Sequence, residues 1–218
     1  MDVSELVIFL MECIGTVAFS VSGATVAIEA GMDVFGVCIL GIVTAVGGGM
    51  VRDVILGQLP VTLVRPVYVI IAAVTALSLF AFLYFRRKCT VPPRAVLRER
   101  ILLVMDAIGL GVFTVMGMVS GIRAGYGDNG FLLVFLGVLT GVGGGVMRDT
   151  MAGFKPYIFV RHIYALSSLF GAILFRVLFP FAGEAIAMIP ACISVVAIRV
   201  LAASFRWNLP KLPPEKRS

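Results

Sequence analysis

Seven long apolar segments dominate this 218-residue sequence. A helix needs about 20 mostly apolar residues to cross the hydrocarbon core of a bilayer. Hydrophobic residues make up 60% of the chain and charged residues only 14%, and such a composition excludes an ordinary soluble domain. We therefore expect an all-α membrane protein with seven transmembrane helices. The expected spans are 5–29, 33–56, 63–85, 99–124, 129–153, 158–179 and 183–205.

A glycine-rich motif occurs in the second of these segments and again in the fifth. Each copy has three adjacent glycines followed by an Arg-Asp pair. Glycine weakens a helix and charge is costly in lipid, so the repeated combination indicates a site. The motif residues are Gly47, Gly48, Gly49, Arg52 and Asp53 in the first copy, and Gly143, Gly144, Gly145, Arg148 and Asp149 in the second.

The sequence around the motif repeats as well. Three spans per repeat is an odd number, so the second repeat must be inverted relative to the first. We expect one transmembrane domain over 1–205, with repeats at 5–85 and 99–179, a seventh helix at 183–205 and a basic, proline-containing tail at 206–218. The matched positions include Arg65 with Arg161, Tyr68 with Tyr164, Ala76 with Ala172, and Glu12 with Asp106.

The distribution of Lys and Arg predicts the orientation in the membrane. Most of them fall in the connector at 86–100, in the loops near 148–161 and in the tail, and basic residues of short loops face the cytoplasm. This predicts a cell-membrane protein with its N-terminus outside and its C-terminus cytoplasmic. The net charge of +6 is then a topology signal, and we expect no nucleic-acid partner.

The glycine triplets have two interpretations. Three adjacent glycines disfavour a helix by about 2–3 kcal/mol relative to alanine, which predicts a kink or break in the second and fifth helices. Freed backbone groups must face protein or water, so such breaks fall along a substrate or ion path. Close helix packing is the alternative, because Gly137, Gly141 and Gly145 also keep the small-residue spacing of tight membrane interfaces.

The charged residues of the motif also leave two interpretations open. Sequence neighbours point in different directions on a helix, so we expect each Arg and Asp to pair across the repeats or to cap broken backbone. Along an ion path, Asp53 and Asp149 would attract cations while the arginines hold the geometry; structural ion pairing is the alternative. Glu12 and Asp106 are further candidate buried acids, for ion contact or for capping a neighbouring helix.

Other kinds of site are not indicated. The glycine runs lack the ending of a nucleotide-binding loop, and neither metal-ligand spacing nor a Ser/His/Asp set occurs. We expect no enzyme activity, no cofactor and no metal beyond transient monovalent cations. The single histidine, His162, lies beside a predicted span start, where we expect a headgroup contact.

The sequence resembles the prokaryotic branch of the trimeric intracellular cation (TRIC) channels. The resemblance rests on the seven spans, the inverted three-span repeats, and the Gly-Gly-Gly followed by Arg-Asp in spans two and five. That branch includes bacterial uncharacterised and glycine-transporter-like relatives, and the resemblance covers residues 5–205. It implies a homotrimer in membrane lipid with one hourglass pore per protomer, and a flux of potassium or sodium with potassium favoured. It places the two triplets at kinks and both Arg-Asp pairs along the pore.

The lysine-rich lipid-binding signature of the animal TRIC members does not occur in this sequence. A carrier or facilitator for a small zwitterion such as glycine is the alternative function. Carriers also build a midplane site from broken helices, so composition does not separate the two.

Overall fold

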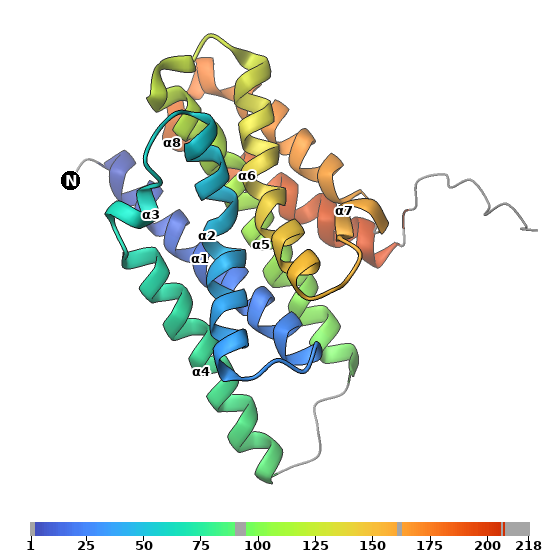
Figure 1. Cartoon of the computed structure of the whole chain (residues 1–218). Helices are drawn as coiled ribbons and strands as arrows, with labels where there is room; N and C mark the ends of the chain where they lie inside the picture. Colours follow the sequence, from blue (N-terminus) through green and yellow to red (C-terminus); the bar gives the residue numbers. More distant parts are fainter. Residues whose placement is uncertain (1–2, 90–94, 161–162, 206, 208–218) are drawn as a thin grey trace, which may run out of the picture.

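The computed structural model describes residues 3–89, 95–160, 163–205 and 207 (Figure 1). Within these ranges the ordered elements are helices. His162, Arg161, positions 90–94 of the basic connector and the predicted tail, apart from Trp207, lie outside the described residues. The elements are α1 (Val3–Glu29), α2 (Val34–Ile55), α3 (Val61–Val64), α4 (Val67–Cys89), α5 (Ala95–Gly121), the π-helical turn η1 (Ile122–Tyr126), α6 (Gly130–Met151), α7 (Tyr157–Val160) and α8 (Tyr164–Ser204).

Six of the described helices are long and apolar enough to cross a membrane: α1, α2, α4, α5, α6 and α8. The predicted all-α membrane architecture is confirmed to that extent, although the sequence predicts seven spans. The difference lies in α8, which joins the predicted spans 158–179 and 183–205 into 41 residues. At a rise of 1.5 Å per residue this is about twice the thickness of the hydrocarbon core.

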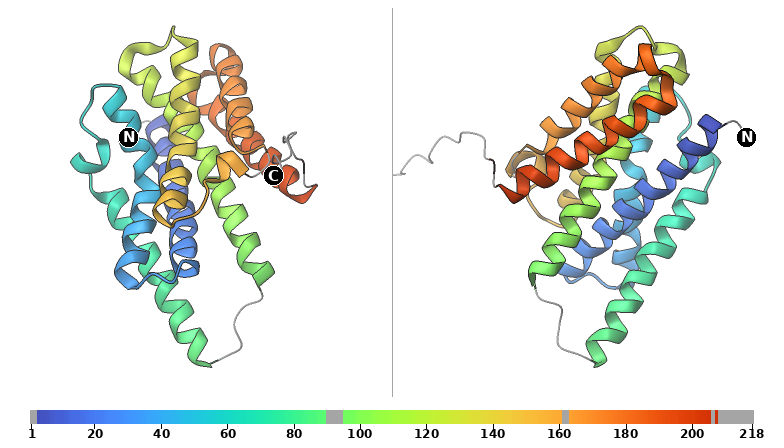
Figure 2. Two further views of the ribbon diagram at one scale, coloured as in Figure 1. Left: turned by 45° about the vertical axis from the view of Figure 1, so that its right-hand side comes forward. Right: turned by 180° about the vertical axis from the view of Figure 1, so that it is seen from behind.

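Helix α8 has two arms that meet at Gly183. This glycine has φ 74° and ψ 176°, which are not helical values, and Pro180 lies just before it. Figure 2 shows the chain reversing direction within α8, from the orange arm into the red arm. We call residues 164–182 the first arm and residues 184–204 the second arm.

Two spans begin later than predicted, because a short helix precedes each of them. Helix α3 ends before Pro66, and the residue before a proline disfavours helical geometry, so α4 starts at Val67. Helix α7 ends before Ile163, which has a left-handed backbone with φ 40°, and α8 starts at Tyr164.

The ends of α2 and α6 are built alike. Asp33 caps α2 by accepting a hydrogen bond from the Gly36 amide at 2.8 Å, and Asn129 caps α6 by accepting one from the Leu132 amide at 3.0 Å. Past their C-terminal ends, Gly57 and Gly153 adopt φ of 69° and 76°, a left-handed conformation typical of glycine. The positions match at a shift of 96 residues.

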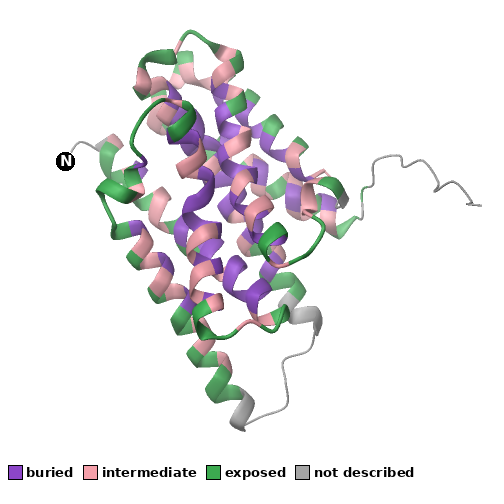
Figure 3. Ribbon diagram, in the orientation of Figure 1, coloured by how far each residue is buried: buried purple, intermediate pink, exposed green. Residues whose placement is uncertain are grey.

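The core lies where α1, α2, α5 and α6 meet, and both arms of α8 add buried residues to it against α5 (Figure 3). Helix α5 is the most buried of the candidate spans, and α4 is the least buried. Helices α2 and α6 pack against each other and run in opposite directions (Figure 1). The buried polar residues gather around this antiparallel pair, as the next section shows.

Candidate functional site

The glycine triplets form the crossing of α2 and α6. A methyl group added to Gly48 would overlap the Thr140 carbonyl oxygen, and one added to Gly144 would overlap the Thr44 carbonyl oxygen. Only glycine lets the two backbones approach this closely. The close-packing interpretation is thus confirmed.

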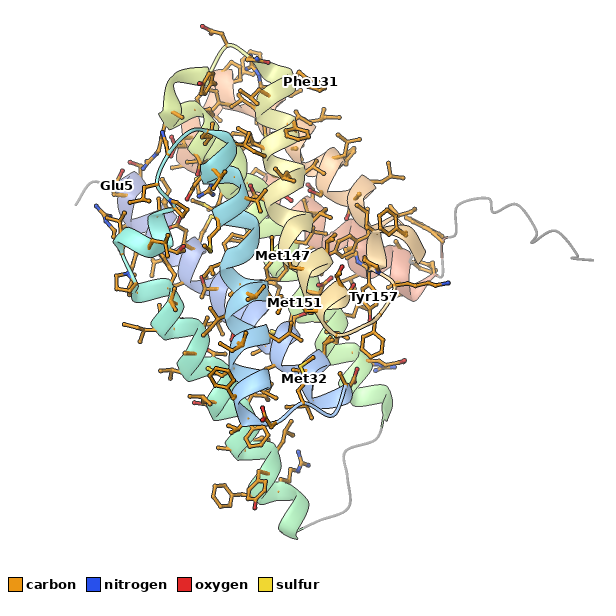
Figure 4. All side chains as sticks on the ribbon, viewed as in Figure 1. Glu5, Met32, Phe131, Met147, Met151 and Tyr157 are labelled. Atoms are coloured by element: carbon orange, nitrogen blue, oxygen red, sulfur yellow. The ribbon has the colours of Figure 1, made fainter. Side chains whose placement is uncertain are left out.

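The predicted break at the triplets is absent, because α2 and α6 remain helical through all six glycines. The local cost of glycine is offset by contacts that the glycines allow across the crossing. Gly143 faces the Gly48 backbone, and Gly47 faces the sulfur of Met147, which Figure 4 labels at the crossing. The other predicted form, a kink of the helix axis at the triplets with the helical hydrogen bonds intact, stays a prediction.

On α6, one turn past Gly144, Arg148 is the centre of a fully buried polar cluster. Its Nη1 atom lies 2.5 Å from Asp106 Oδ1, and its Nε atom donates to Asp149 Oδ1 at 2.8 Å. The same Nη1 donates to the hydroxyl of Ser22 on α1, which belongs to the other repeat. The hydroxyl of Tyr164 donates to Asp106 Oδ1 at 3.4 Å. We call Asp106, Arg148, Asp149 and Tyr164 the repeat-two cluster.

Helix α7 covers this cluster. The amide of Tyr157 donates to Asp149 Oδ2 at 2.9 Å, and its ring lies 5.2 Å from the guanidinium carbon of Arg148. Asp149 therefore bonds both to its neighbour on α6 and to the start of α7. The arginine is enclosed by groups of opposite charge and an aromatic face.

The repeat-one cluster comprises Glu12, Arg52, Asp53 and Tyr68. Arg52 Nε donates to Asp53 Oδ1 at 2.8 Å, and Asp53 Oδ2 accepts from the Val61 amide at 2.9 Å. The hydroxyl of Tyr68 donates to Glu12 Oε2. Each of these three contacts has its counterpart in the repeat-two cluster, whereas the contacts of Arg148 with Asp106 and Ser22 are found in repeat two only, among the described residues.

Each arginine bonds to the aspartate next to it in sequence, as the structural ion-pairing alternative allows, and Arg148 has a second carboxylate partner in Asp106. The long arginine side chain turns back along the helix, so its Nε reaches the carboxylate of the next residue. The expected cross-repeat contact occurs once, from Arg148 to Ser22. Each Asp instead accepts a hydrogen bond from the first amide of the short helix that follows, which differs from the expected capping of broken backbone at the triplets.

The two clusters differ in access. A cavity of about 470 Å³ opens onto the repeat-one cluster, and Glu5, labelled in Figure 4, lies in its wall near the start of α1. We call this cavity the vestibule. A smaller space of about 30 Å³, enough to hold water, lies beside Glu12, Asp53 and Thr62 and shares Glu12 and Asp53 with the vestibule wall. By contrast, Arg148 and Asp106 have no exposed side-chain surface.

Sequence reasoning missed Arg199. It lies on the second arm of α8, is 3% exposed, and places its guanidinium carbon 5.1 Å from the centre of the Tyr164 ring. The available signal was a single arginine inside the apolar run 183–205. Among the described residues no group of His, Cys, Asp and Glu is arranged to hold a metal ion.

A family model described as "Glycine transporter" matches residues 9–84 and 103–180, which together form most of the chain. These ranges nearly coincide with the two predicted repeats. The chain is a member of this family. Its relatives include the UPF0126 inner membrane protein YadS of Escherichia coli, 34% identical over 209 residues that cover 95% of this chain and 96% of that protein. A UPF0126 membrane protein of Deinococcus radiodurans is 39% identical over 165 residues, covering 74% and 72% of the two chains.

Solved structures similar to this family member are TRIC channels. The TRIC orthologue from Rhodobacter sphaeroides has a TM-score of 0.81 at 33% identity and covers 92% of this chain and 98% of its own. A prokaryotic TRIC channel in 0.5 M KCl has a TM-score of 0.84 at 26% identity, covering 94% and 100%. The resemblance to the prokaryotic TRIC branch is confirmed. This glycine transporter family member is a multi-pass membrane protein of TRIC-like fold.

Proposed function

We propose that this protein is a cation channel that favours potassium, with one pore in each protomer of a homotrimer. The observation that carries the proposal is the match of nearly the whole chain to solved TRIC cation channels, including one with a TM-score of 0.79 at 34% identity over 94% of this chain. The family model's description, a glycine transporter, supplies the competing function.

The geometry supports a path through the protomer. In our proposal, cations enter the vestibule, pass the Glu12 and Asp53 carboxylates, and reach the α2–α6 crossing. Carboxylates in a water-filled entrance attract cations, while each arginine fixes the position of its neighbouring aspartate. The glycine triplets set the width at the crossing, and a bend there during opening would widen it. Asp106 and Asp149 line the other half of the path.

The proposed topology has two inverted repeats and a seventh crossing by the second arm of α8. The antiparallel α2 and α6, with matching caps and matching Arg-Asp contacts, support the inversion. The N-terminus lies outside and the C-terminus lies inside, so the vestibule opens outward. The transmembrane domain covers 1–205, followed by the cytoplasmic tail 206–218.

Uptake of potassium and of glycine into liposomes tests the channel proposal against the glycine facilitator. Purified protein is reconstituted, and uptake of a potassium tracer and of radiolabelled glycine is measured in parallel. The channel proposal predicts potassium uptake that follows the membrane potential and no glycine uptake above protein-free liposomes. Saturable glycine uptake without potassium flux would replace the channel by a facilitator.

A further inference from the structure

Arg199 is a buried cation that comes from outside the two repeats. Arginine stays charged in proteins, and a charge inside an apolar span is costly in free energy. An arginine at such a position therefore usually marks a functional site. The described structure gives its Nε atom no hydrogen-bond partner, although the atom is buried. The guanidinium instead lies against the face of the Tyr164 ring, at 5.1 Å from the ring centre. A cation–π contact of this kind holds a charge without fixing hydrogen-bond geometry.

Tyr164 connects this charge to the repeat-two cluster. Its hydroxyl lies 3.4 Å from Asp106 Oδ1, the oxygen that also meets Arg148. The other oxygen of Asp106 and the Nη2 atom of Arg148 are buried without hydrogen-bond partners in the described structure. The carboxylate thus keeps an unused acceptor in a place that solvent does not reach.

The formal charges of this cluster balance only when Arg199 is counted. Asp106 and Asp149 supply two negative charges, and Arg148 supplies one positive charge. Arg199 supplies the second positive charge, so the group is neutral as a whole. Without Arg199 it would have a formal charge of minus one.

The repeat-one cluster has the charge that its counterpart would have without Arg199. Glu12 and Asp53 supply two negative charges, and Arg52 supplies one positive charge. Tyr68, the counterpart of Tyr164, borders open space: it lines both the vestibule and the small cavity beside it, and Arg65 and Arg123 also lie in the vestibule wall. The open cluster therefore has a formal charge of minus one among its own members, with Glu5, Arg65 and Arg123 also lining the vestibule, and the sealed cluster is neutral once Arg199 is counted.

We propose that Arg199 limits permeation by acting as a tethered counter-ion of the repeat-two cluster. Its charge occupies a place at the Tyr164 ring, whose hydroxyl bonds to Asp106, and a permeating cation would otherwise take that place. This inference rests on the proposed function, because it requires that the protein conduct cations. Arg199 then sets how tightly a cation binds at the repeat-two cluster, and it is more than a packing contact of the helix core.

The test compares three variants in planar bilayers over a series of symmetrical potassium chloride concentrations. Arg199→Gln and Arg199→Met remove the charge, and Met keeps an unbranched apolar side chain over the tyrosine ring. Arg199→Lys keeps the charge and the cation–π contact, and is the matched control. For each we measure the potassium concentration at which the unitary conductance is half-maximal. Trimer assembly is measured by size-exclusion chromatography.

We expect both neutral variants to reach half-maximal conductance at a potassium concentration lower by about tenfold or more, because a positive charge that repels cations from the repeat-two cluster has been removed. Arg199→Lys is expected to follow the wild-type curve. An unchanged conductance–concentration curve in a neutral variant that still assembles would overturn the inference. Loss of assembly in both neutral variants, with normal assembly of Arg199→Lys, would also overturn it, because Arg199 would then be a structural residue. Absence of potassium current in the wild type would instead refute the proposed function.

Discussion

Arg148 Nη1 lies 2.5 Å from Asp106 Oδ1, and neither side chain has any exposed surface. The pair joins α5 to α6 inside the predicted membrane span. Removing one partner of such a pair leaves the other charge buried and uncompensated, which is more costly than the pair is stabilising. The buried polar cluster is therefore a structural constraint on how α5 and α6 pack.

Asp106→Asn is expected to destabilise the protein by about 3 kcal/mol, because Arg148 loses one of its two carboxylate partners in a buried site. The measurement is thermal unfolding in detergent. Glu12→Gln is the matched control at the repeat-equivalent position, where the acid faces the vestibule and bonds to Tyr68. Equal destabilisation by the two changes would contradict the claim that the acid of the repeat-two cluster is sealed from solvent while the acid of the repeat-one cluster is open to it.

Gly48→Ala is expected to destabilise the crossing of α2 and α6 by about 1–3 kcal/mol or to prevent assembly, because its methyl group would overlap the Thr140 carbonyl oxygen. Gly49→Ala is the control within the same triplet. The nearest atom to a methyl group there is Arg52 Nη2 at 3.7 Å, an ordinary contact, and alanine favours the helix. The measurement is the unfolding temperature of each variant. A Gly49→Ala variant as unstable as Gly48→Ala would argue against close packing at the crossing.

The sequence predicted the all-α membrane architecture and the positions of α1, α2, α5 and α6, because these depend on local hydropathy and on repetition. It did not predict that the helices continue through the triplets. That outcome depends on contacts between Gly48 and Thr140, or between Gly144 and Thr44, which are distant in sequence. The position of Arg199 over Tyr164 likewise required the path of the second arm of α8, which turns back at Gly183.

The inverted topology predicts opposite labelling of two matched loop positions. Gln58 and Phe154 are 96 residues apart, and both are exposed in the turn that follows their Arg-Asp pair. In a background without the four native cysteines, Gln58→Cys is expected to react with a membrane-impermeant maleimide added outside, and Phe154→Cys only after permeabilisation. Labelling of both from one side would remove the inverted-repeat proposal.

Asp53→Asn is expected to lower potassium conductance and the preference for cations over chloride, because it removes a negative charge from the vestibule at nearly constant shape. The measurement is the reversal potential in a potassium chloride gradient, with Glu29→Gln as a control at an exposed position on α1 away from the vestibule lining. Asp149→Asn tests the other half of the path in the same way. An unchanged reversal potential in both aspartate variants would exclude these carboxylates from the path.

Single-channel recording of the wild-type protein in a planar bilayer under a potassium chloride gradient tests the central claim most directly. The account predicts discrete openings whose current reverses near the potassium equilibrium potential. A correctly assembled protein that gives no openings, or whose current reverses near the chloride potential, would contradict it.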